Sequence, residues 1–415
     1  MQLLDNRVRP YAWGSRTTIA ALLGREVPAP HPEAELWLGA HPGDPSAIVA
    51  ADGTARSLVE VLAEDPIGQL GQAVVGRWGD RLPFLLKVLA AEEPLSLQAH
   101  PSAVQAAEGY AREEKAGIAR EAGNRNYPDP TAKPELLCAL TEFHALAGFR
   151  SPARTVELLR AIETPALAGY VDLLAGEPDR EGLRALFTTW ITLPQPAIDA
   201  LLPDLLDACV THVKEHGEFE LECRTALELG ERYPGDTGVL AALLLNRLVL
   251  QAGEAIFLPA GNLHTYLHGT AIEVLANSDN VLRGGLTPKH VDVPELLRVL
   301  DFGFGDMTVC TGEPAGPRRV YRTPAPEFEL SRIEWAPDEP RAEVKLEGGV
   351  PRVMVCVEGG VRVAAVDGRE LSLGRGQSMW LPALDPDVVL APVGDSPVRL
   401  FAATVGGATA GVSSL

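Results

Sequence analysis

The stretch from about residue 151 to 235 differs from the sequence on either side of it. Apolar residues recur at three- and four-residue spacing in four of its segments: Thr155–Ile162, Arg180–Ile191, Pro196–His216 and Phe219–Tyr233. This spacing is typical of amphipathic helices, and Ser151-Pro152 favours a helix start. The flanking sequence is broken by Pro and Gly into short apolar runs, which indicates strands and turns. We therefore expect a mainly β chain interrupted by an all-helical block.

Alternating segments at 255–258, 270–275, 352–357 and 361–366 predict strands after the helical block. Lys289–Leu300 is predicted as a helix, with Asp292 as N-cap and Pro294 in its first turn. Four parts follow: a β domain over 1–150, an inserted helical domain over 151–235, the second part of the β domain over 236–314, and a second β domain over 315–415. Residues 406–415 are expected to form a loose tail.

One internal repeat bears on the β domains. The frame G-x5-P-x-G-x2-H runs from Gly253 to His264, and a degenerate copy starts at Gly376, with Leu384 replacing the second Gly and Asp387 the His. The frame resembles the second signature motif of cupin barrels. It predicts two cupin-like jelly-roll barrels, the first able to hold a metal and the second without its ligand. A chance match of the degenerate copy is the alternative.

Charge limits the partners of the chain. Its 36 Lys and Arg against 56 Asp and Glu give a net charge of -20, which disfavours nucleic acid and anionic lipid surfaces. A phosphorylated ligand would need a local cluster of basic groups. No apolar run is long enough to cross a bilayer, no signal-peptide pattern begins the chain, and the cysteines are scattered. We expect a cytoplasmic protein with free thiols.

The segment Pro94–Pro101 is rich in polar groups. Because strand side chains alternate, Ser96, Gln98 and His100 share one face. Three polar groups on the inner face of a small barrel are costly unless they bind something. His100 alone could still be a satisfied, half-buried histidine.

Two further segments add candidate ligands. Lys133 and Glu135 share a face by the same alternation, and so do His264 and Tyr266. Two imidazoles, a carboxylate and an amide oxygen make a mixed nitrogen and oxygen site that suits zinc.

Several blocks of the chain resemble the type I mannose-6-phosphate isomerase family, in the order in which that family carries them. They are Tyr11–Gly14, Ala34–Pro42, Phe84–Leu89 with Leu95–Pro101, Asn126–Pro130 with Lys133–Glu135, and Ser278–Lys289 with Asp292–Pro294. The resemblance implies a cupin catalytic barrel with an inserted helical domain and a second C-terminal barrel. It also implies one Zn²⁺ held by Gln98, His100, Glu135 and His264.

The activity that the resemblance implies is the interconversion of mannose 6-phosphate and fructose 6-phosphate through an enediolate. Arg283 is then expected to stabilise the developing negative charge. Lys87 and Ser96 are the first choice for the phosphate, followed by Lys133 and Lys289. The base is open between Lys133 and Asp279. The family usually has His before its K-P-E, whereas this chain has Ala132, which puts a proton path through that His in doubt.

Two other functions remain open. An Fe(II) cupin dioxygenase could use the two histidines and the glutamate, and a non-catalytic cupin could bind a sugar phosphate without turnover. His212–His216 fits the metallopeptidase pattern H-x-x-E-H but is read as an exposed helix face. His31, His41, His144 and His290 are read as structural. The partner is expected to be a small sugar phosphate and the chain a monomer.

Overall fold

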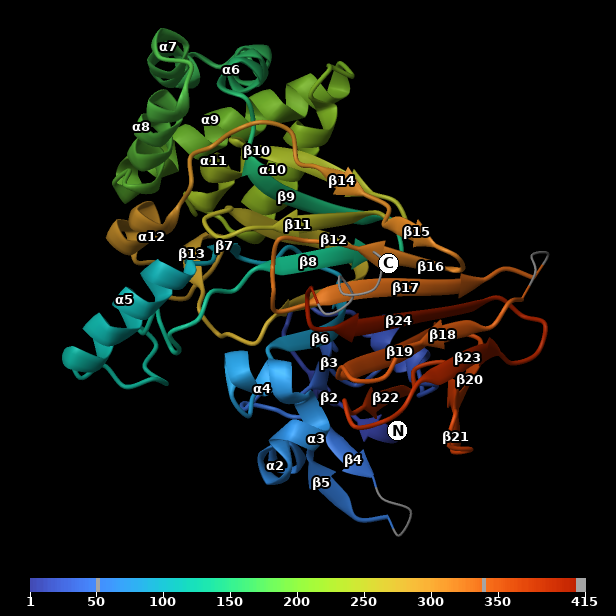
Figure 1. Cartoon of the computed structure of the whole chain (residues 1–415). Coiled ribbons are helices and arrows are strands. Elements are labelled where there is room, and N and C mark those ends of the chain that lie inside the picture. Colours follow the sequence, from blue (N-terminus) through green and yellow to red (C-terminus); the bar gives the residue numbers. More distant parts are fainter. Residues whose placement is uncertain (50–52, 338–340, 408–415) are drawn as a thin grey trace, which may run out of the picture.

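The computed structural model describes residues 1–49, 53–337 and 341–407, so most of the predicted tail lies outside the described residues. The described chain is built from antiparallel strands in sheets of nine, eleven and four strands, and the helices between residues 152 and 242 are gathered at the top (Figure 1). Among these residues, no helix is long and apolar enough to span a bilayer. The expected combination of β-sheets with helices is confirmed at this level.

The eleven-stranded sheet carries the segments singled out in the sequence. Its strands are β2 (Arg7–Arg9), β3 (Glu35–Gly39), β6 (Phe84–Ala91), β7 (Leu97–Ala99), β8 (Glu135–Ala139), β9 (Phe143–Phe149), β10 (Leu245–Leu250), β11 (Ala255–Leu258), β12 (His264–Ala276), β13 (Leu282–Gly285) and β14 (Val309–Cys310).

The long strand β12 changes partners along its length. Its first residues pair with β7 and β9, whereas the residues from Gly269 onward pair with β6 and β8. Gly269 has a φ of +123°, and a Cβ there would lie 2.7 Å from the carbonyl oxygen of Glu142. Only glycine accommodates this bend. The bend lets strands distant in sequence surround one polar cavity.

The nine-stranded sheet joins the two ends of the chain. Its C-terminal strands are β15 (Glu313–Ala315), β16 (Arg318–Tyr321), β17 (Glu329–Trp335), β19 (Arg352–Glu358), β22 (Ser378–Leu381) and β24 (Val398–Thr404). The N-terminal strands β1 (Gln2–Asp5), β4 (Ala47–Val49) and β5 (Ala55–Ser57) extend this sheet, because β1 pairs with β22. The early residues therefore contribute to both large sheets.

The four-stranded sheet consists of β18 (Val344–Leu346), β20 (Gly360–Ala365), β21 (Glu370–Gly374) and β23 (Val388–Pro392). A single apolar cluster, which includes Met354, Cys356, Val363, Leu390 and Leu400, packs its strands against those of the nine-stranded sheet. This region has a closed apolar core.

The helical block lies between β9 and β10, which pair with each other. It contains α6 (Pro152–Ala161), a short 3-10 turn (Pro165–Leu167), α7 (Ala168–Gly176), α8 (Arg180–Ile191), α9 (Gln195–Lys214), α10 (Glu220–Arg232) and α11 (Gly238–Ala242). Its core includes Leu97 and Ala99 of β7. These side chains point into the helices, as the alternation predicts. The helix α12 (Val293–Val299) has Asp292 as its N-cap, with the carboxylate accepting from the Glu295 N–H at 3.1 Å.

The prediction of only strands and turns over residues 1–150 is wrong. This region also holds α1 (Thr18–Leu22), α2 (Leu58–Glu64), α3 (Pro66–Leu70), α4 (Gln72–Trp78) and α5 (Ala103–Lys115). Local start signals were present in the sequence. Asp65 caps α3 with Pro66 at its first position, and Ser102 with Gln105 forms a capping box on α5. The surrounding Pro and Gly residues obscured these signals.

Candidate metal centre and sugar-phosphate cavity

Three predicted ligands come together in the structure. His100, Glu135 and His264 are all buried, and one ligand atom from each lies within 4.8 Å of the others. The Nε2 atom of His100 lies 3.3 Å from Oε1 of Glu135, and that of His264 lies 3.4 Å from Oε2. They come from the end of β7, the start of β8 and the start of β12. Segments far apart in the sequence therefore build one cluster.

Both imidazoles are oriented for metal binding. The Nδ1 atom of His100 is 2.8 Å from the carbonyl oxygen of Asn280, and that of His264 is 3.1 Å from the carbonyl oxygen of Asn262. A carbonyl only accepts, so each Nδ1 carries a proton, and in a neutral imidazole Nε2 is then the lone pair that can bind a metal. Both Nε2 atoms and Oε2 of Glu135 are buried without a hydrogen-bond partner. Orphaned acceptors this close together fit a bound cation.

The protonation states agree with this assignment. Burial lowers the pKa of His100 to about 4, despite the opposing effect of Glu135, so the imidazole is neutral near pH 7. Burial alone would raise the pKa of Glu135, but interactions with His100 and Lys133 hold it well below its usual range. Two neutral imidazoles and one carboxylate are the form in which these groups bind zinc.

Strand register places Gln98 and Arg283 beside His264 across adjacent strands. In β7, Gln98 lies opposite His264 of β12 on one side and opposite Arg283 of β13 on the other. Residues opposite one another on adjacent strands point to the same face. All the predicted cavity residues except Asp279, His100 and His264 line one cavity of about 420 Å³: Lys87, Ser96, Gln98, Lys133, Glu135, Arg283 and Lys289.

The cations of the cavity are not equivalent. The Nζ atom of Lys87 is buried, 3.5 Å from Glu35 and 3.1 Å from Glu273. Desolvation works against its charge, but these carboxylates raise its pKa overall. Lys133 lies 3.4 Å from Glu135. The positive charges of Lys87 and Lys133 are therefore largely balanced by neighbouring carboxylates.

Arg283 and Lys289 have a different environment. Desolvation lowers the pKa of both, and the charge of Arg283 also lowers that of Lys289. Neither has an ion-pair partner in the part of the chain that the structure describes. They therefore supply the uncompensated positive charge of the cavity, which is what an anionic group requires.

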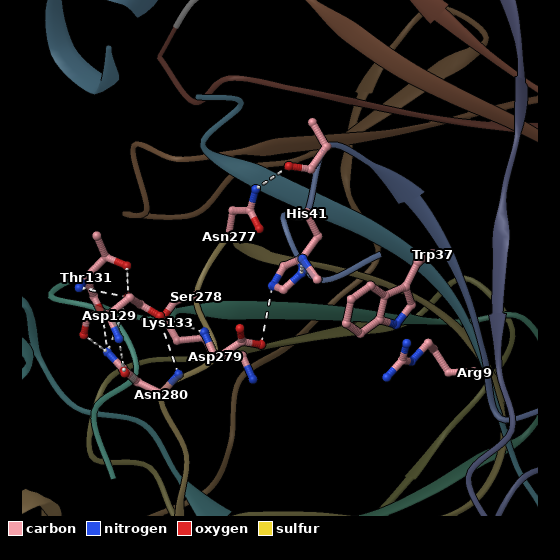
Figure 2. Close-up of polar contacts among 12 residues, drawn as sticks. Arg9, Trp37, His41, Asp129, Thr131, Lys133, Asn277, Ser278, Asp279 and Asn280 are labelled. Atoms are coloured by element: carbon pink, nitrogen blue, oxygen red, sulfur yellow. Dashed lines mark hydrogen bonds and ion pairs between the residues drawn. The ribbon is translucent and has the colours of Figure 1, made fainter. Parts of the chain in front are cut away.

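Asp279 is not among the residues that line the cavity, but the cavity lysines Lys133 and Lys87 act on its carboxylate. Its carboxylate is 3.3 Å from Nε2 of His41, and its backbone N–H donates to Asp129 at 2.8 Å (Figure 2). The hydrogen bond from His41 is the main reason why its pKa is lowered; Lys133 and Lys87 contribute further. The contact of His41 with Asp279 was not anticipated.

Ala132 is not among the residues that line the cavity of the predicted ligands. It lines a separate cavity of about 650 Å³ together with Pro42 and Thr131, whereas Lys133 and Glu135 line the smaller one. Ala132 and its neighbour Lys133 therefore line different cavities.

Two carboxylates of the site were missed at the sequence level. Glu35 accepts from the indole N–H of Trp37 at 2.6 Å, and Glu273 accepts from the hydroxyl of Tyr266 at 2.8 Å. Glu273 interrupts the apolar strand β12, and a buried charge in such a strand was the available signal.

The H-x-x-E-H pattern is not held on one helix. Helix α9 ends at Lys214, and His216 lies beyond it with a φ of +54° and pairs with Glu220 at 3.0 Å. The expectation that both histidines sit on one helix is wrong, because the chain turns away one residue after Glu215. His144, read as structural, has its ring centroid 4.0 Å from that of His268, with the planes tilted by 35°, and contacts Glu142 at 2.9 Å.

The chain is similar to known enzymes over almost its whole length. Residues 1–152 match the model of the phosphomannose isomerase type I catalytic domain. The mannose-6-phosphate isomerase of Escherichia coli (strain K12) is 38% identical over 397 residues, which cover 94% of this chain and 97% of that protein. Mannose-6-phosphate isomerase 1 of Arabidopsis thaliana is 31% identical over 422 residues, which cover 96% of this chain and 92% of that protein.

Solved structures agree with these sequence matches. A zinc-bound mannose 6-phosphate isomerase superimposes with a TM-score of 0.87 at 35% identity, covering 98% of this chain and 99% of that one. A mutant phosphomannose isomerase from Salmonella typhimurium gives the same TM-score, identity and coverage. Similarity of this extent, together with a buried His-Glu-His cluster beside a cationic cavity, shows that the chain belongs to the type I mannose-6-phosphate isomerase family.

Proposed function

We propose that this chain is a zinc-dependent aldose–ketose isomerase that interconverts mannose 6-phosphate and fructose 6-phosphate. The observation that carries the proposal is the buried cluster of His100, Glu135 and His264 beside the cavity that holds Arg283 and Lys289. A metal site and an uncompensated pair of cations in one place suit a phosphorylated sugar.

In this proposal Gln98, His100, Glu135 and His264 hold one Zn²⁺. The bound ion would supply a Lewis acid that polarises the oxygens at C1 and C2 of the open-chain sugar. Arg283 and Lys289 are the better phosphate anchor, because Glu35 and Glu273 already balance the charge of Lys87. Lys87 and Ser96 then contact the sugar, and Arg283 also stabilises the enediolate charge.

The proton between C1 and C2 would be carried by Lys133 or Asp279. Lys133 is placed in the cavity and held by Glu135, whereas Asp279 is the group whose carboxylate is already ionised near neutral pH. An ionised carboxylate can accept the carbon-bound proton directly, whereas Lys133 must first lose its own proton. A hydroxyl proton moves from O2 to O1 as the carbon-bound proton moves from C2 to C1.

The architecture has a finer interpretation as well. We propose a cupin catalytic barrel over 1–150 and 236–314, a helical domain inserted at 151–235, and a metal-free cupin-like barrel over 315–415. Support comes from the helices between the paired strands β9 and β10. Strands β1, β4 and β5 would then be N-terminal additions to the sheet of the second barrel. A cytoplasmic monomer completes the proposal.

The test is an assay on purified protein of known metal content. Mannose 6-phosphate is supplied, and fructose 6-phosphate formation is coupled to a dehydrogenase readout before and after chelation. Turnover that chelation abolishes and zinc restores supports the proposal. Zinc-loaded protein without turnover would favour a non-catalytic sugar-phosphate binder, and iron-loaded protein that consumes oxygen would favour a dioxygenase.

A further inference from the structure

A buried histidine holds an exposed aspartate beside the proposed active site. His41 is 5% exposed, whereas the side chain of Asp279 is 57% exposed, and Nε2 of the first lies 3.3 Å from Oδ1 of the second. Within the described part of the chain, the other carboxylate oxygen of Asp279 has no hydrogen-bond partner. Figure 2 shows the carboxylate directed at the imidazole ring.

His41 itself is fixed in one tautomer and one orientation. The N–H of Gly43 donates to its Nδ1 at 3.1 Å, so the ring proton resides on Nε2 and faces Asp279. The ring packs edge-on against Trp37, with ring centroids 4.8 Å apart. Trp37 is in turn held by Glu35, which lines the metal cavity. The donor is therefore pre-organised before any substrate binds.

The backbone of Asp279 is fixed as well. The carboxylate of Asp129 accepts from the Asp279 N–H at 2.8 Å and from the Ser278 hydroxyl at 2.9 Å. The next carbonyl along the chain, that of Asn280, accepts from Nδ1 of His100. The short loop 278–280 therefore does two things. It orients His100, a predicted metal ligand, and it fixes the backbone position of Asp279.

We propose that His41 is a positioning residue that holds the Asp279 carboxylate as the proton carrier of the isomerisation. This rests on the proposed function. The free oxygen of Asp279 takes the proton from C2, which forms its O–H bond as the C–H bond breaks, and returns it to C1. The hydroxyl proton moves from O2 to O1, so nothing is consumed. His41 keeps its own proton throughout. An imidazole thus lies beside Asp279 in a chain that has Ala132 before its K-P-E.

The alternative is that the pair only anchors the loop, and the two roles differ in their pH dependence. The groups that act on Asp279 are His41, which contributes most to lowering its pKa, and then Lys133 and Lys87, while burial opposes them; Asp129 contacts its backbone. Removing the His41 donor raises the pKa of the carboxylate. A base with a raised pKa is protonated at higher pH, so the acidic limb of the kcat profile moves to higher pH.

The experiment compares His41→Ala, His41→Gln and His41→Phe with the unmodified zinc-loaded enzyme on mannose 6-phosphate. The Ala and Phe variants should lose about 10- to 100-fold in kcat, as expected for a misplaced catalytic group, with KM little changed and the acidic limb shifted upward. The Gln variant keeps an N–H donor, so its kcat and the position of its acidic limb should both lie close to those of the parent. The exposed His31→Ala is the matched control and should behave as the parent.

Each outcome decides a separate question. An unshifted acidic limb in His41→Phe, or a Gln variant no better than Phe, overturns the positioning role. Gln and Phe both fill the site, so their comparison holds even if His41→Ala fails to fold, and zinc content and melting temperature report on folding. If the unmodified enzyme does not turn over, the proposed function fails and the inference fails with it. Normal turnover in the parent and in every variant overturns the inference alone.

Discussion

The two Gly-x5-Pro frames fold alike but end in opposite environments. Gly253 and Gly376 have φ of +90° and +80°, and each donates its N–H to a neighbouring strand before the chain enters a four-residue strand, β11 or β22. The first frame ends at His264 in the buried polar cluster. The second ends at Asp387, which pairs with Lys345 at 2.6 Å near the surface.

The difference lies in what the other strands supply. Around the first frame, neighbouring strands place charged and polar side chains on the inner face, including Lys87, Gln98 and Glu135. Around the second, the facing side chains are apolar, such as Met354 and Leu400. Burial of apolar groups stabilises the fold, whereas buried charges cost free energy unless they are paired or bind a cation. A local backbone frame therefore makes a metal site only when its neighbours supply donors.

The largest effect is expected from Glu135→Gln, which removes the only carboxylate of the cluster while keeping its shape. Metal affinity should fall by more than the ~10- to 100-fold typical of changes outside the ligand shell, and turnover should fall with it. Metal analysis after dialysis, alongside the coupled assay, measures both. Full zinc content in this variant would show that metal binding near the first frame does not depend on Glu135.

Arg283→Ala should separate metal binding from chemistry within the first region. Its charge has no ion-pair partner in the described chain, so the fold has little to lose. We expect turnover to fall by roughly 100- to 1,000-fold, as for other groups that stabilise developing charge, with zinc retained. Turnover within a few-fold of the parent would remove Arg283 from the catalytic residues.

Met354→Ala tests the second region, where apolar side chains fill the interior. Met354 is fully buried in the cluster between the two sheets. Its truncation should lower the free energy of unfolding by about 2–5 kcal/mol, with zinc content and kcat of the folded protein unchanged. Denaturant unfolding and the coupled assay check this. A loss of zinc would show that the two regions are coupled through the shared sheet.

Asp387→Ala should have the smallest effect. This residue occupies the place of His264 in the second frame, but its carboxylate contacts Lys345 and the Gly348 N–H rather than a buried cluster. The contact with Lys345 is a surface ion pair, which contributes little. We expect unchanged zinc content and turnover and a small shift in melting temperature. A change in metal content would mean that the second frame has kept a binding role.

The sequence specified much of the fold where the signals were local. Helix α8 has the predicted bounds, and α12 begins after the predicted cap. Strand alternation predicted that Leu97 and Ala99 share a face, and both pack in the helical core, because the pleat fixes that relation within a few residues. The helices α1 to α5 were missed, since turn-forming residues around them resemble those of a strand-and-turn region.

The residue types that can hold a metal and the order of the motifs were determined by the sequence alone, because they follow from side-chain chemistry and short spacings. Only the tertiary structure decided which charges are balanced. Glu35 and Glu273 balance Lys87 across three strands, and His41 contacts Asp279, which lies far along the sequence. These contacts depend on strand pairing and on the bend at Gly269. Long-range pairing is set by the packing of the whole chain, so no local pattern could have revealed them.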